Sequence, residues 1–275
     1  MLSRVVVLHA DKDPQNGIPH PGSHQIYKNP RMFLENRELG PLHPEEIRVK
    51  MIYAGVCGTD VHLVTANPDN GYIQCSAPAN IPTGGRVIGH EGVGEVLEIG
   101  SRVCHLKPGD FVTFESIIVC HYCEECRRGR FNQCRNALLL GLERDGLLGD
   151  IVDVPSMIAH NVSDLAKSDK GRRAAACIEP AAVAYVACQK THLGAGDTVV
   201  IFGAGPIGVF TAMLSKRVLG ASQVHVIEPV PFRRKLAEKW SDAVYDVEEF
   251  FNRGPSCVDV VVEASGNMRN ISRVL

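Results

Sequence analysis

The sequence has no uninterrupted apolar stretch of about 20 residues, so it contains no candidate for a membrane-spanning helix. Its opening residues, MLSRVVVLHADKD, carry an apolar run too short for the core of a secretion signal. It also lacks a charge excess, because 29 Lys and Arg residues are set against 31 Asp and Glu residues. These absences predict a cytoplasmic protein with neither a membrane nor a nucleic acid as partner.

Cysteine, by contrast, is not scarce, because the 275 residues include ten. Disulfides are rare in reducing compartments, and the sequence shows no secretion signal. We therefore expect thiols or metal ligands rather than a disulfide framework. With 45% apolar and 22% charged residues, the chain is typical of a globular protein that has room for two domains.

The composition changes near residue 178. Up to that point, short β-branched runs are separated by Gly- and Pro-containing turns, which is typical of a β-rich domain. Beyond it, alanine-rich stretches that favour helix, beginning with 174–190, alternate with apolar strands such as 198–202 and 258–262. This alternation predicts a parallel sheet. We expect a β-rich domain over residues 1–178 and an α/β domain over residues 179–275.

Two loops are too long to be simple connectors, one from about Asp11 to Asn29 and one from about Thr65 to Gly85. Each carries several Pro, Gly and Asn residues and shows little periodicity. The second lies between two candidate metal-binding motifs. We hypothesise that it borders a substrate pocket and influences specificity.

Four cysteines lie close together in a short polar segment: Cys120, Cys123, Cys126 and Cys134. Buried core cysteines would not be spaced three apart among charged neighbours, whereas four thiolates can close a tetrahedron around a structural zinc ion. Such a closed site contributes to folding and leaves no position for water or substrate. An iron-sulfur cluster also uses four thiolates, and the spacing alone leaves that alternative open.

A second candidate metal site combines Cys57 with His90, each of which lies beside small residues that would let a substrate approach. A third ligand is expected from Cys177 or Glu179. These two residues are two positions apart on an expected helix and face nearly opposite ways, so only one of them can reach the metal. Three protein ligands and one exchangeable position are typical of catalytic zinc.

A glycine fingerprint, formed by Gly203, Gly205 and Gly208, directly follows an apolar strand and opens an expected helix. This context predicts a dinucleotide site, with the pyrophosphate at the helix amino terminus. Glu228 follows the next strand and is expected to accept hydrogen bonds from the adenosine ribose. Its carboxylate favours NAD over NADP, although the nearby Arg233 leaves NADP as an alternative.

With these residues in place, the sequence resembles the zinc-dependent medium-chain alcohol dehydrogenases, and within them the sorbitol and polyol branch. The resemblance runs from about Val49 to the carboxyl terminus and includes the Cys57-Gly-Thr-Asp-x-His62 and Gly89-His-Glu-x-x-Gly94 motifs. The four-cysteine segment, the Glu179-Pro180 pair and the glycine fingerprint complete it. The resemblance implies an α/β protein with a GroES-like β domain that holds both zinc ions, followed by a doubly wound Rossmann domain.

The resemblance also implies roles for individual residues. The ligands of the catalytic zinc would be Cys57, His90 and Glu179, with Glu91 behind the metal as a supporting or exchangeable ligand. Asp60 would orient His90. The bound zinc would stabilise an alkoxide of the substrate while a hydride passes to the nicotinamide, and the proton would travel outward through two catalytic residues, Thr59 and His62.

Members of this family continue beyond the strand at 258–262 with further Rossmann strands, whereas this chain ends at Leu275. We therefore expect a partial Rossmann domain. The leading hypothesis is an oxidoreductase that acts on a secondary alcohol, such as a polyol, sugar or cyclitol, and that can form a homo-oligomer. The alternative is a truncated, inactive zinc-binding remnant or interaction module. The two metal motifs disfavour a zinc-free quinone reductase of the same superfamily.

Overall fold

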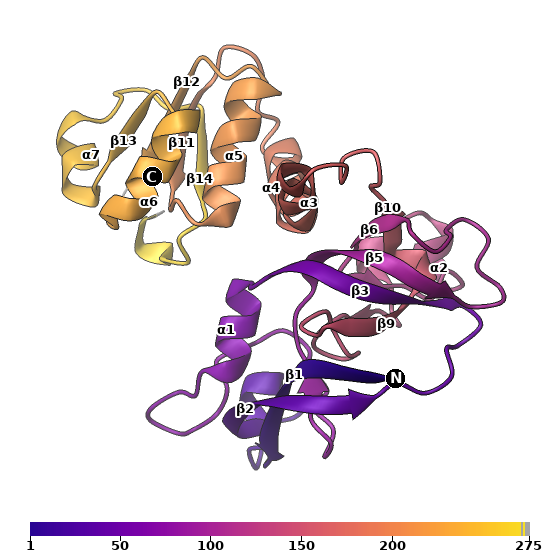
Figure 1. Ribbon diagram of the computed structural model, residues 1–275. Coiled ribbons are helices and arrows are strands. Elements are labelled where there is room, and N and C mark those ends of the chain that lie inside the picture. Colours follow the sequence, from indigo (N-terminus) through magenta and orange to yellow (C-terminus); the bar gives the residue numbers. More distant parts are fainter. Residues whose placement is uncertain (271, 273–275) are drawn as a thin grey trace. The chain divides into compact units, whose positions relative to one another are not determined.

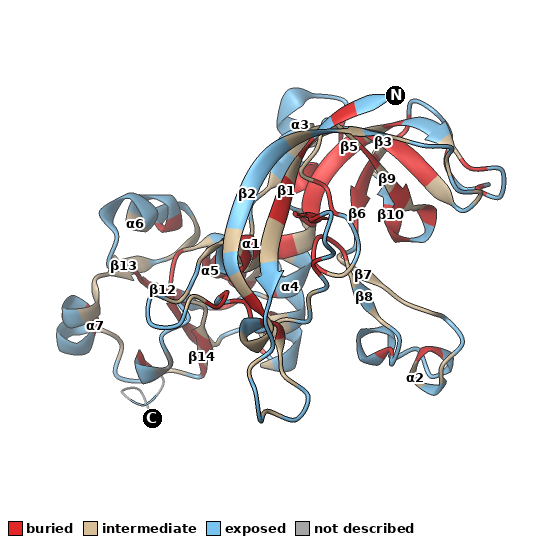
Figure 2. Ribbon diagram, turned by 90° about the horizontal axis from the view of Figure 1, so that it is seen from below, coloured by how far each residue is buried: buried red, intermediate tan, exposed pale blue. Residues whose placement is uncertain are grey.

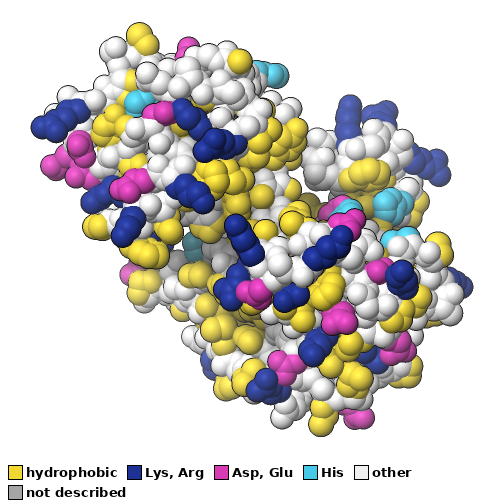
Figure 3. Space-filling view, turned by 45° about the horizontal axis from the view of Figure 1, so that its top comes forward, with side chains coloured by type: hydrophobic (Ala, Val, Ile, Leu, Met, Phe, Trp, Pro, Cys, Tyr) yellow, Lys and Arg dark blue, Asp and Glu magenta, His cyan; other side chains and the backbone are white. Residues whose placement is uncertain are grey.

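The computed structural model describes residues 1–270 and 272. The chain divides into two compact units, Met1–Glu179 and Pro180–Leu275, and each is described by itself (Figure 1). Within the described residues, no helix is long and apolar enough to cross a membrane. On the face shown in Figure 3, basic and acidic side chains are interspersed, in keeping with the net charge of -2.

The first unit opens with a long antiparallel hairpin formed by β1 (Leu2–Lys12) and β2 (Tyr27–Glu38). On its other side β1 pairs with the short strand β4 (Arg86–Val87), which gives the order β2-β1-β4. The buried residues of β1 are Ser3, Val5, Val7 and Leu8, whereas β2 is an edge strand that is exposed over most of its length, as Figure 2 shows. The hairpin therefore packs through β1.

A five-stranded antiparallel sheet with the order β10-β6-β5-β3-β9 forms the centre of this unit. The sequence predicted strands at 46–52, 94–100 and 111–114, and all three regions lie in this sheet. Alternate apolar side chains, among them Ile47, Val49 and Val112, point into one shared core. The strands are β3 (Glu46–Gly55), β5 (Glu91–Ile99), β6 (Phe111–Phe114), β9 (Ile151–Pro155) and β10 (Ala159–Asn161).

Short elements complete the first unit. A two-stranded ladder joins β7 (Ile117–Ile118) to β8 (Leu138–Leu139) and brings together the two ends of the four-cysteine segment. The helices are α1 (Gly58–Val64), α2 (Glu124–Arg127) and α3 (Asp169–Ala176), and α4 (Ile178–Lys190) continues into the second unit.

The sequence predicted one continuous helix from residue 174 to residue 190, and the structure corrects this. α3 ends at Ala176, Cys177 forms its C-cap, and α4 begins at Ile178. Pro180 explains the break, because proline within a continuous helix would clash with the carbonyl group of residue 176 and remove a hydrogen bond. In the first turn of a new helix the same proline is tolerated.

The second unit contains the predicted parallel sheet, with the order β13-β12-β11-β14. Apolar side chains alternate between its two faces. Those of Val199 and Ile201 pack in the cluster that includes alanines of α5 and α6, whereas Val200 and Phe202 pack with Phe250 of α7. The elements are β11 (Thr198–Phe202), β12 (Gln223–Ile227), β13 (Ala243–Tyr245), β14 (Val260–Glu263), α5 (Pro206–Arg217), α6 (Pro231–Ala237) and α7 (Val247–Arg253).

Candidate functional site

The four predicted cysteines gather in one cluster, in which all four sulfur atoms lie within 4.8 Å of one another. The sulfur of Cys134 is 3.6 Å from that of Cys120 and 4.0 Å from that of Cys123. Zinc bonded to four sulfurs at ~2.3 Å requires sulfur separations of roughly 3.8 Å. The cluster therefore has the size of a site for a single ion, which favours zinc over the iron-sulfur alternative.

Local structure prepares these sulfurs for a cation. The backbone N–H groups of Cys120 and Cys123 donate hydrogen bonds to cysteine sulfurs, each at 3.4 Å. Desolvation acts to raise the pKa of Cys120, but hydrogen bonds from Asn136 and from two backbone groups lower it to about 6. Desolvation raises the pKa of Cys126 to about 12. At neutral pH the cluster thus already contains a favoured thiolate.

A second cluster joins Cys57, His90 and Glu91, whose ligand atoms also lie within 4.8 Å of one another. Cys57 is the N-cap of α1, His90 precedes β5, and Glu91 begins that strand. The histidine and the glutamate are buried, whereas the cysteine is half-buried. A thiolate, an imidazole and a carboxylate are a suitable donor set for zinc, and the half-buried Cys57 is the member of the set that solvent reaches most easily.

Asp60 ties together the two segments that carry these ligands. Its side chain is 2% exposed, and its oxygens accept hydrogen bonds from the backbone N–H of Cys57 at 2.9 Å and of Gly89 at 3.1 Å. Its distance to His90 Nδ1 is 4.0 Å, and that nitrogen has no hydrogen-bond partner within the described residues. Asp60 therefore positions the backbone at both ligands and lies 4.0 Å from the imidazole that it is expected to orient.

The charges around the second cluster favour a bound cation. Burial acts to lower the pKa of His90, but its hydrogen bond to Cys57 and the charges of Asp60, Cys57 and Glu179 raise that pKa to about 9. Burial, followed by the charge of Glu179, raises the pKa of Glu91. A metal ion at this position would offset the mutual repulsion of these carboxylates.

Glu179, the third ligand that the sequence predicted, lies next to the cluster and is not one of the three residues whose ligand atoms lie within 4.8 Å of one another. It lies in the first turn of α4, and its Oε1 accepts a hydrogen bond of 2.8 Å from the hydroxyl of Ser116. Glu91 therefore stands in the three-ligand cluster, and Glu179 stands beside it. Sequence reasoning did not find Ser116, because the contact joins residues 63 positions apart and no motif marks it.

The two residues predicted to carry a proton lie on α1. Thr59 Oγ1 accepts a hydrogen bond of 3.7 Å from the sulfur of Cys57, which places this hydroxyl directly at the candidate metal ligand. His62 is three residues further along, about one helical turn, and is exposed to solvent. The helix thus leads from the cluster to the surface.

The three fingerprint glycines of the second unit meet three different requirements. Gly203 has a φ of +98° and turns the chain after β11. A Cβ atom at Gly208 would lie 1.9 Å from the carbonyl oxygen of Gly203. Gly205 is the N-cap of α5 and faces open space. The first glycine therefore permits the turn, the third permits close helix packing, and the second leaves room for a ligand at the helix terminus.

Glu228 follows β12 and is buried, with 3% of its surface exposed. Its Oε2 accepts a hydrogen bond of 2.8 Å from the N–H of Ala204, and its Oε1 accepts one of 2.9 Å from the N–H of Val230. The carboxylate thus braces the glycine turn from within, a role that sequence reasoning did not predict. Each oxygen retains acceptor capacity for a ribose hydroxyl. Arg233 lies nearby at an exposed position of α6.

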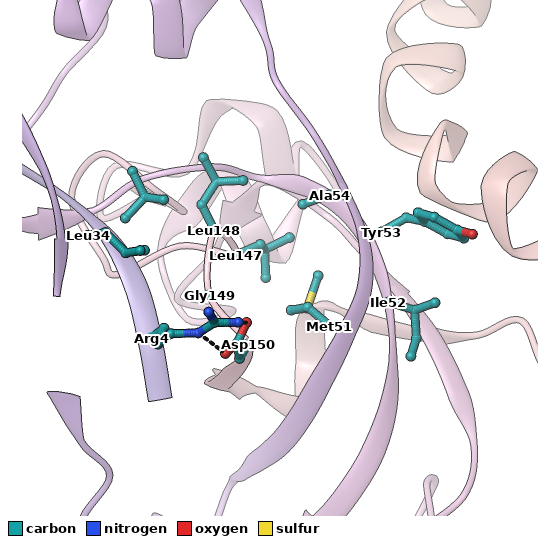
Figure 4. A pocket seen from close by; sticks show the side chains of 11 residues that line it. Arg4, Leu34, Met51, Ile52, Tyr53, Ala54, Leu147, Leu148, Gly149 and Asp150 are labelled. Atoms are coloured by element: carbon teal, nitrogen blue, oxygen red, sulfur yellow. Dashed lines mark hydrogen bonds and ion pairs between the residues drawn. The ribbon is translucent and has the colours of Figure 1, made fainter. Parts of the chain in front are cut away.

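A separate groove of about 410 Å³ lies in the first unit (Figure 4). Residues of β1, β2 and β3 and of the segment 147–150 line it, and Arg4 pairs with Asp150 at 2.8 Å on one wall. None of the predicted ligands or cofactor residues lines this groove. The chemistry described above therefore lies outside it.

Comparison with known proteins shows which domain family and which enzymes this chain is similar to. Residues 43–164 match the family described as alcohol dehydrogenase GroES-like domain. The chain is 39% identical over 188 residues to the L-arabinitol 4-dehydrogenase of Aspergillus oryzae. The matched region covers 68% of this chain and 46% of that protein. It is 35% identical over 205 residues to the L-threonine 3-dehydrogenase of Caldanaerobacter subterraneus subsp. tengcongensis. This matched region covers 74% of this chain and 54% of that protein.

Solved structures show the same fold. The 2R,3R-butanediol dehydrogenase of Bacillus subtilis superimposes with a TM-score of 0.71 at 27% identity, over 96% of this chain and 71% of that one. An alcohol dehydrogenase from Thermus sp. ATN1 superimposes with a TM-score of 0.74 at 25% identity, over 98% of this chain and 72% of that one. The predicted fold class, a GroES-like domain with an α/β domain, is confirmed. The chain spans about half the length of the curated relatives it matches.

Proposed function

Since this chain belongs to the zinc-dependent medium-chain alcohol dehydrogenase family, we propose that it serves in hydride transfer between a secondary alcohol and a nicotinamide dinucleotide. The observation that carries this proposal is the convergence of Cys57, His90 and Glu91, from two separate segments, to within 4.8 Å. These three donors would hold a catalytic zinc ion, and Cys120, Cys123, Cys126 and Cys134 would hold a structural one.

Both donor sets fit zinc. The four sulfurs have separations close to those of a tetrahedron, and the second cluster offers three ligands, which would leave one coordination position of a zinc ion for the substrate. A zinc ion in the open site supplies a Lewis acid that lowers the pKa of a coordinated hydroxyl group. We propose that Glu179, 2.8 Å from the Ser116 hydroxyl and electrostatically coupled to His90 and Glu91, is an exchangeable ligand or orients the substrate hydroxyl.

Two side chains of α1 provide the path for the proton. The Thr59 hydroxyl, already in contact with the sulfur of Cys57, would accept the proton that the substrate alcohol releases. His62, one turn away and exposed, would pass it to solvent, which suits an imidazole because its ordinary pKa is near neutral.

The second unit would bind the dinucleotide. Gly203, Gly205 and Gly208 shape the amino terminus of α5 for the pyrophosphate, and Glu228 would accept hydrogen bonds from the adenosine ribose. Two backbone N–H groups hold this carboxylate in place. Its negative charge would also repel a 2′-phosphate. We propose NAD as the cofactor. NADP is the second candidate, because the exposed Arg233 could pair with that phosphate.

The substrate class follows from the relatives. Their names, L-arabinitol 4-dehydrogenase, L-threonine 3-dehydrogenase and 2R,3R-butanediol dehydrogenase, all specify an alcohol at an internal carbon. We therefore propose a small secondary alcohol, such as a polyol, sugar or cyclitol, as substrate. We also propose that residues 1–178 form the zinc-binding domain and residues 179–275 form part of the Rossmann domain. We further propose that the protein is a homo-oligomer in solution and that it is located in the cytoplasm, where reducing conditions preserve thiolate ligands.

Transfer of a deuterium label tests this function. Zinc-loaded protein would be incubated with NAD and a panel of polyols that carry deuterium on one secondary carbinol carbon, and the reduced cofactor would be examined by mass spectrometry. The proposal expects labelled NADH with at least one polyol. Failure to bind NADH in a fluorescence titration, together with the absence of label, would favour an inactive zinc-binding remnant instead.

A further inference from the structure

The two long loops that the sequence analysis singled out lie against each other in the structure. The N–H of Ile73 donates to the carbonyl of Tyr27, and the N–H of Asn29 donates to the carbonyl of Gly71, each at 3.0 Å. The Tyr72 hydroxyl donates to the carbonyl of Asp13 at 2.8 Å. Residues from both loops therefore form one continuous surface.

Between these loops lies a recess of about 370 Å³. Eight residues line it, and none of them is Asp, Glu, Lys or Arg. Tyr72 and Ile73 are buried and form its apolar part, and His24 is exposed at its edge. The other five lining residues all carry side-chain amides: Gln15, Gln25, Asn67, Asn70 and Gln74.

Three of these amides are held in a defined orientation by the backbone. The side-chain oxygens of Gln25, Asn67 and Asn70 accept hydrogen bonds from the N–H groups of residues 22, 69 and 72, at 3.0, 2.9 and 3.1 Å. Because each oxygen is engaged, the NH2 group of the same amide is left as the donor for a ligand. Gln74 has the opposite arrangement, since its Nε2 donates to the carbonyl of Ala66 at 3.4 Å and leaves its oxygen as an acceptor.

The two charged residues that contact Tyr72, Lys28 and Asp13, are paired with each other. The Lys28 ammonium lies 4.6 Å from the centre of the Tyr72 ring and forms an ion pair of 2.9 Å with Asp13. The lining offers a phosphate or carboxylate ligand no Lys or Arg side chain, and these are the side chains that pair most strongly with such anions. Hydroxyl groups both donate and accept hydrogen bonds, so they match a lining that offers oriented NH2 groups and an amide oxygen. The C–H face of a sugar can pack against the tyrosine and the isoleucine.

We propose that this recess binds a neutral polyhydroxylated molecule, a sugar or a sugar alcohol, at a site separate from the metal centre. It lies at the other end of α1 from Cys57, because the N–H of Gln74 donates to the carbonyl of His62 near the end of that helix. This inference does not depend on the proposed dehydrogenase function. The two long loops would together form a ligand-binding site.

Side-chain amide NMR spectra of the full chain test the proposal, with sorbitol as the probe. The NH2 signals of Asn67 and Asn70, assigned from single variants, are expected to shift in a saturable manner. The same shifts are expected in Cys57→Ser, which lacks a ligand of the metal centre, so failure of the proposed catalytic function would leave this result unchanged.

Isosteric variants provide the decisive comparison. Asn67→Asp and Asn70→Asp keep the oxygen that accepts the backbone N–H but remove the donor, so each should weaken sorbitol binding by at least about fivefold. Backbone spectra confirm that the fold is retained. Gln189→Glu introduces the same charge change at an exposed position of α4 and should leave the affinity unaltered.

Three results would overturn the inference. The first is the absence of shifts at these amides at saturating sorbitol. The second is unchanged affinity in both Asn→Asp variants. The third is gluconate binding as tightly as sorbitol, since an anionic analogue should bind more weakly in a recess without Lys or Arg side chains.

Discussion

Ser116 donates a hydrogen bond of 2.8 Å to Glu179, and this contact holds the carboxylate beside the Cys57, His90 and Glu91 cluster. Hydrogen bonds to charged groups contribute about 1.5–3 kcal/mol. A double-mutant cycle with Ser116→Ala and Glu179→Gln should therefore give a coupling of about 1–2 kcal/mol in urea unfolding, because the pair is only partly buried. Additive effects of the two substitutions would show that the contact is absent in solution.

Asp60 should be essential to the geometry of the metal centre. Asp60→Asn would turn an NH2 group toward one of two backbone N–H groups, and leaving a buried donor unpaired costs about 1–3 kcal/mol. We expect a loss of about 2 kcal/mol in unfolding free energy and weaker zinc binding. Asp164→Asn, at a fully exposed side chain, is the matched control and should change stability by less than about 0.5 kcal/mol. Equal effects of the two variants would refute this role.

The four-cysteine segment should depend on its ion for structure. Cys123→Ser removes one of four sulfurs and should release one zinc ion per chain, with increased proteolysis confined to the segment around residues 120–136. Cys104→Ser, at an exposed cysteine outside both clusters, should retain all the zinc and the protease resistance of the unaltered protein. Limited proteolysis with mass spectrometry measures both. A Cys123→Ser variant with full zinc content would contradict the closed four-sulfur site.

The fingerprint glycines should respond differently to an added methyl group. At Gly208 a Cβ atom would lie 1.9 Å from the Gly203 carbonyl oxygen, so Gly208→Ala should destabilise the second unit by ~3 kcal/mol or more. At Gly205 a Cβ atom meets open space, so Gly205→Ala should leave the melting temperature unchanged and weaken NADH binding. Thermal unfolding and fluorescence titration separate the two effects. Unaltered NADH affinity in Gly205→Ala would place the pyrophosphate elsewhere.

Local patterns allowed much of this protein to be predicted from its sequence. The spacing of Cys120 to Cys134 predicted a four-sulfur cluster, and the glycines after an apolar strand predicted the turn into α5, because both features arise within a few residues. The choice between Glu91 and Glu179 could not be predicted in this way. It depends on the turn at Gly89, whose φ is +93°, and on the distant partner Ser116.

Other differences have equally specific causes. The break at Cys177 could have been predicted, because Pro180 cannot lie within a continuous helix. The bracing role of Glu228 could not, since it requires knowing that the turns after β11 and β12 lie side by side. The recess between the two long loops likewise arises only when residues about 50 positions apart are brought together by folding.

Zinc analysis of four proteins tests the central claim most directly. By plasma mass spectrometry, the unaltered chain should contain two zinc ions. Cys57→Ala and Glu91→Gln should each contain one, because the ligand atoms of Cys57, His90 and Glu91 form the cluster. Glu179→Gln should keep both ions. Full zinc content in Glu91→Gln, or loss of an ion in Glu179→Gln alone, would contradict the ligand set described here.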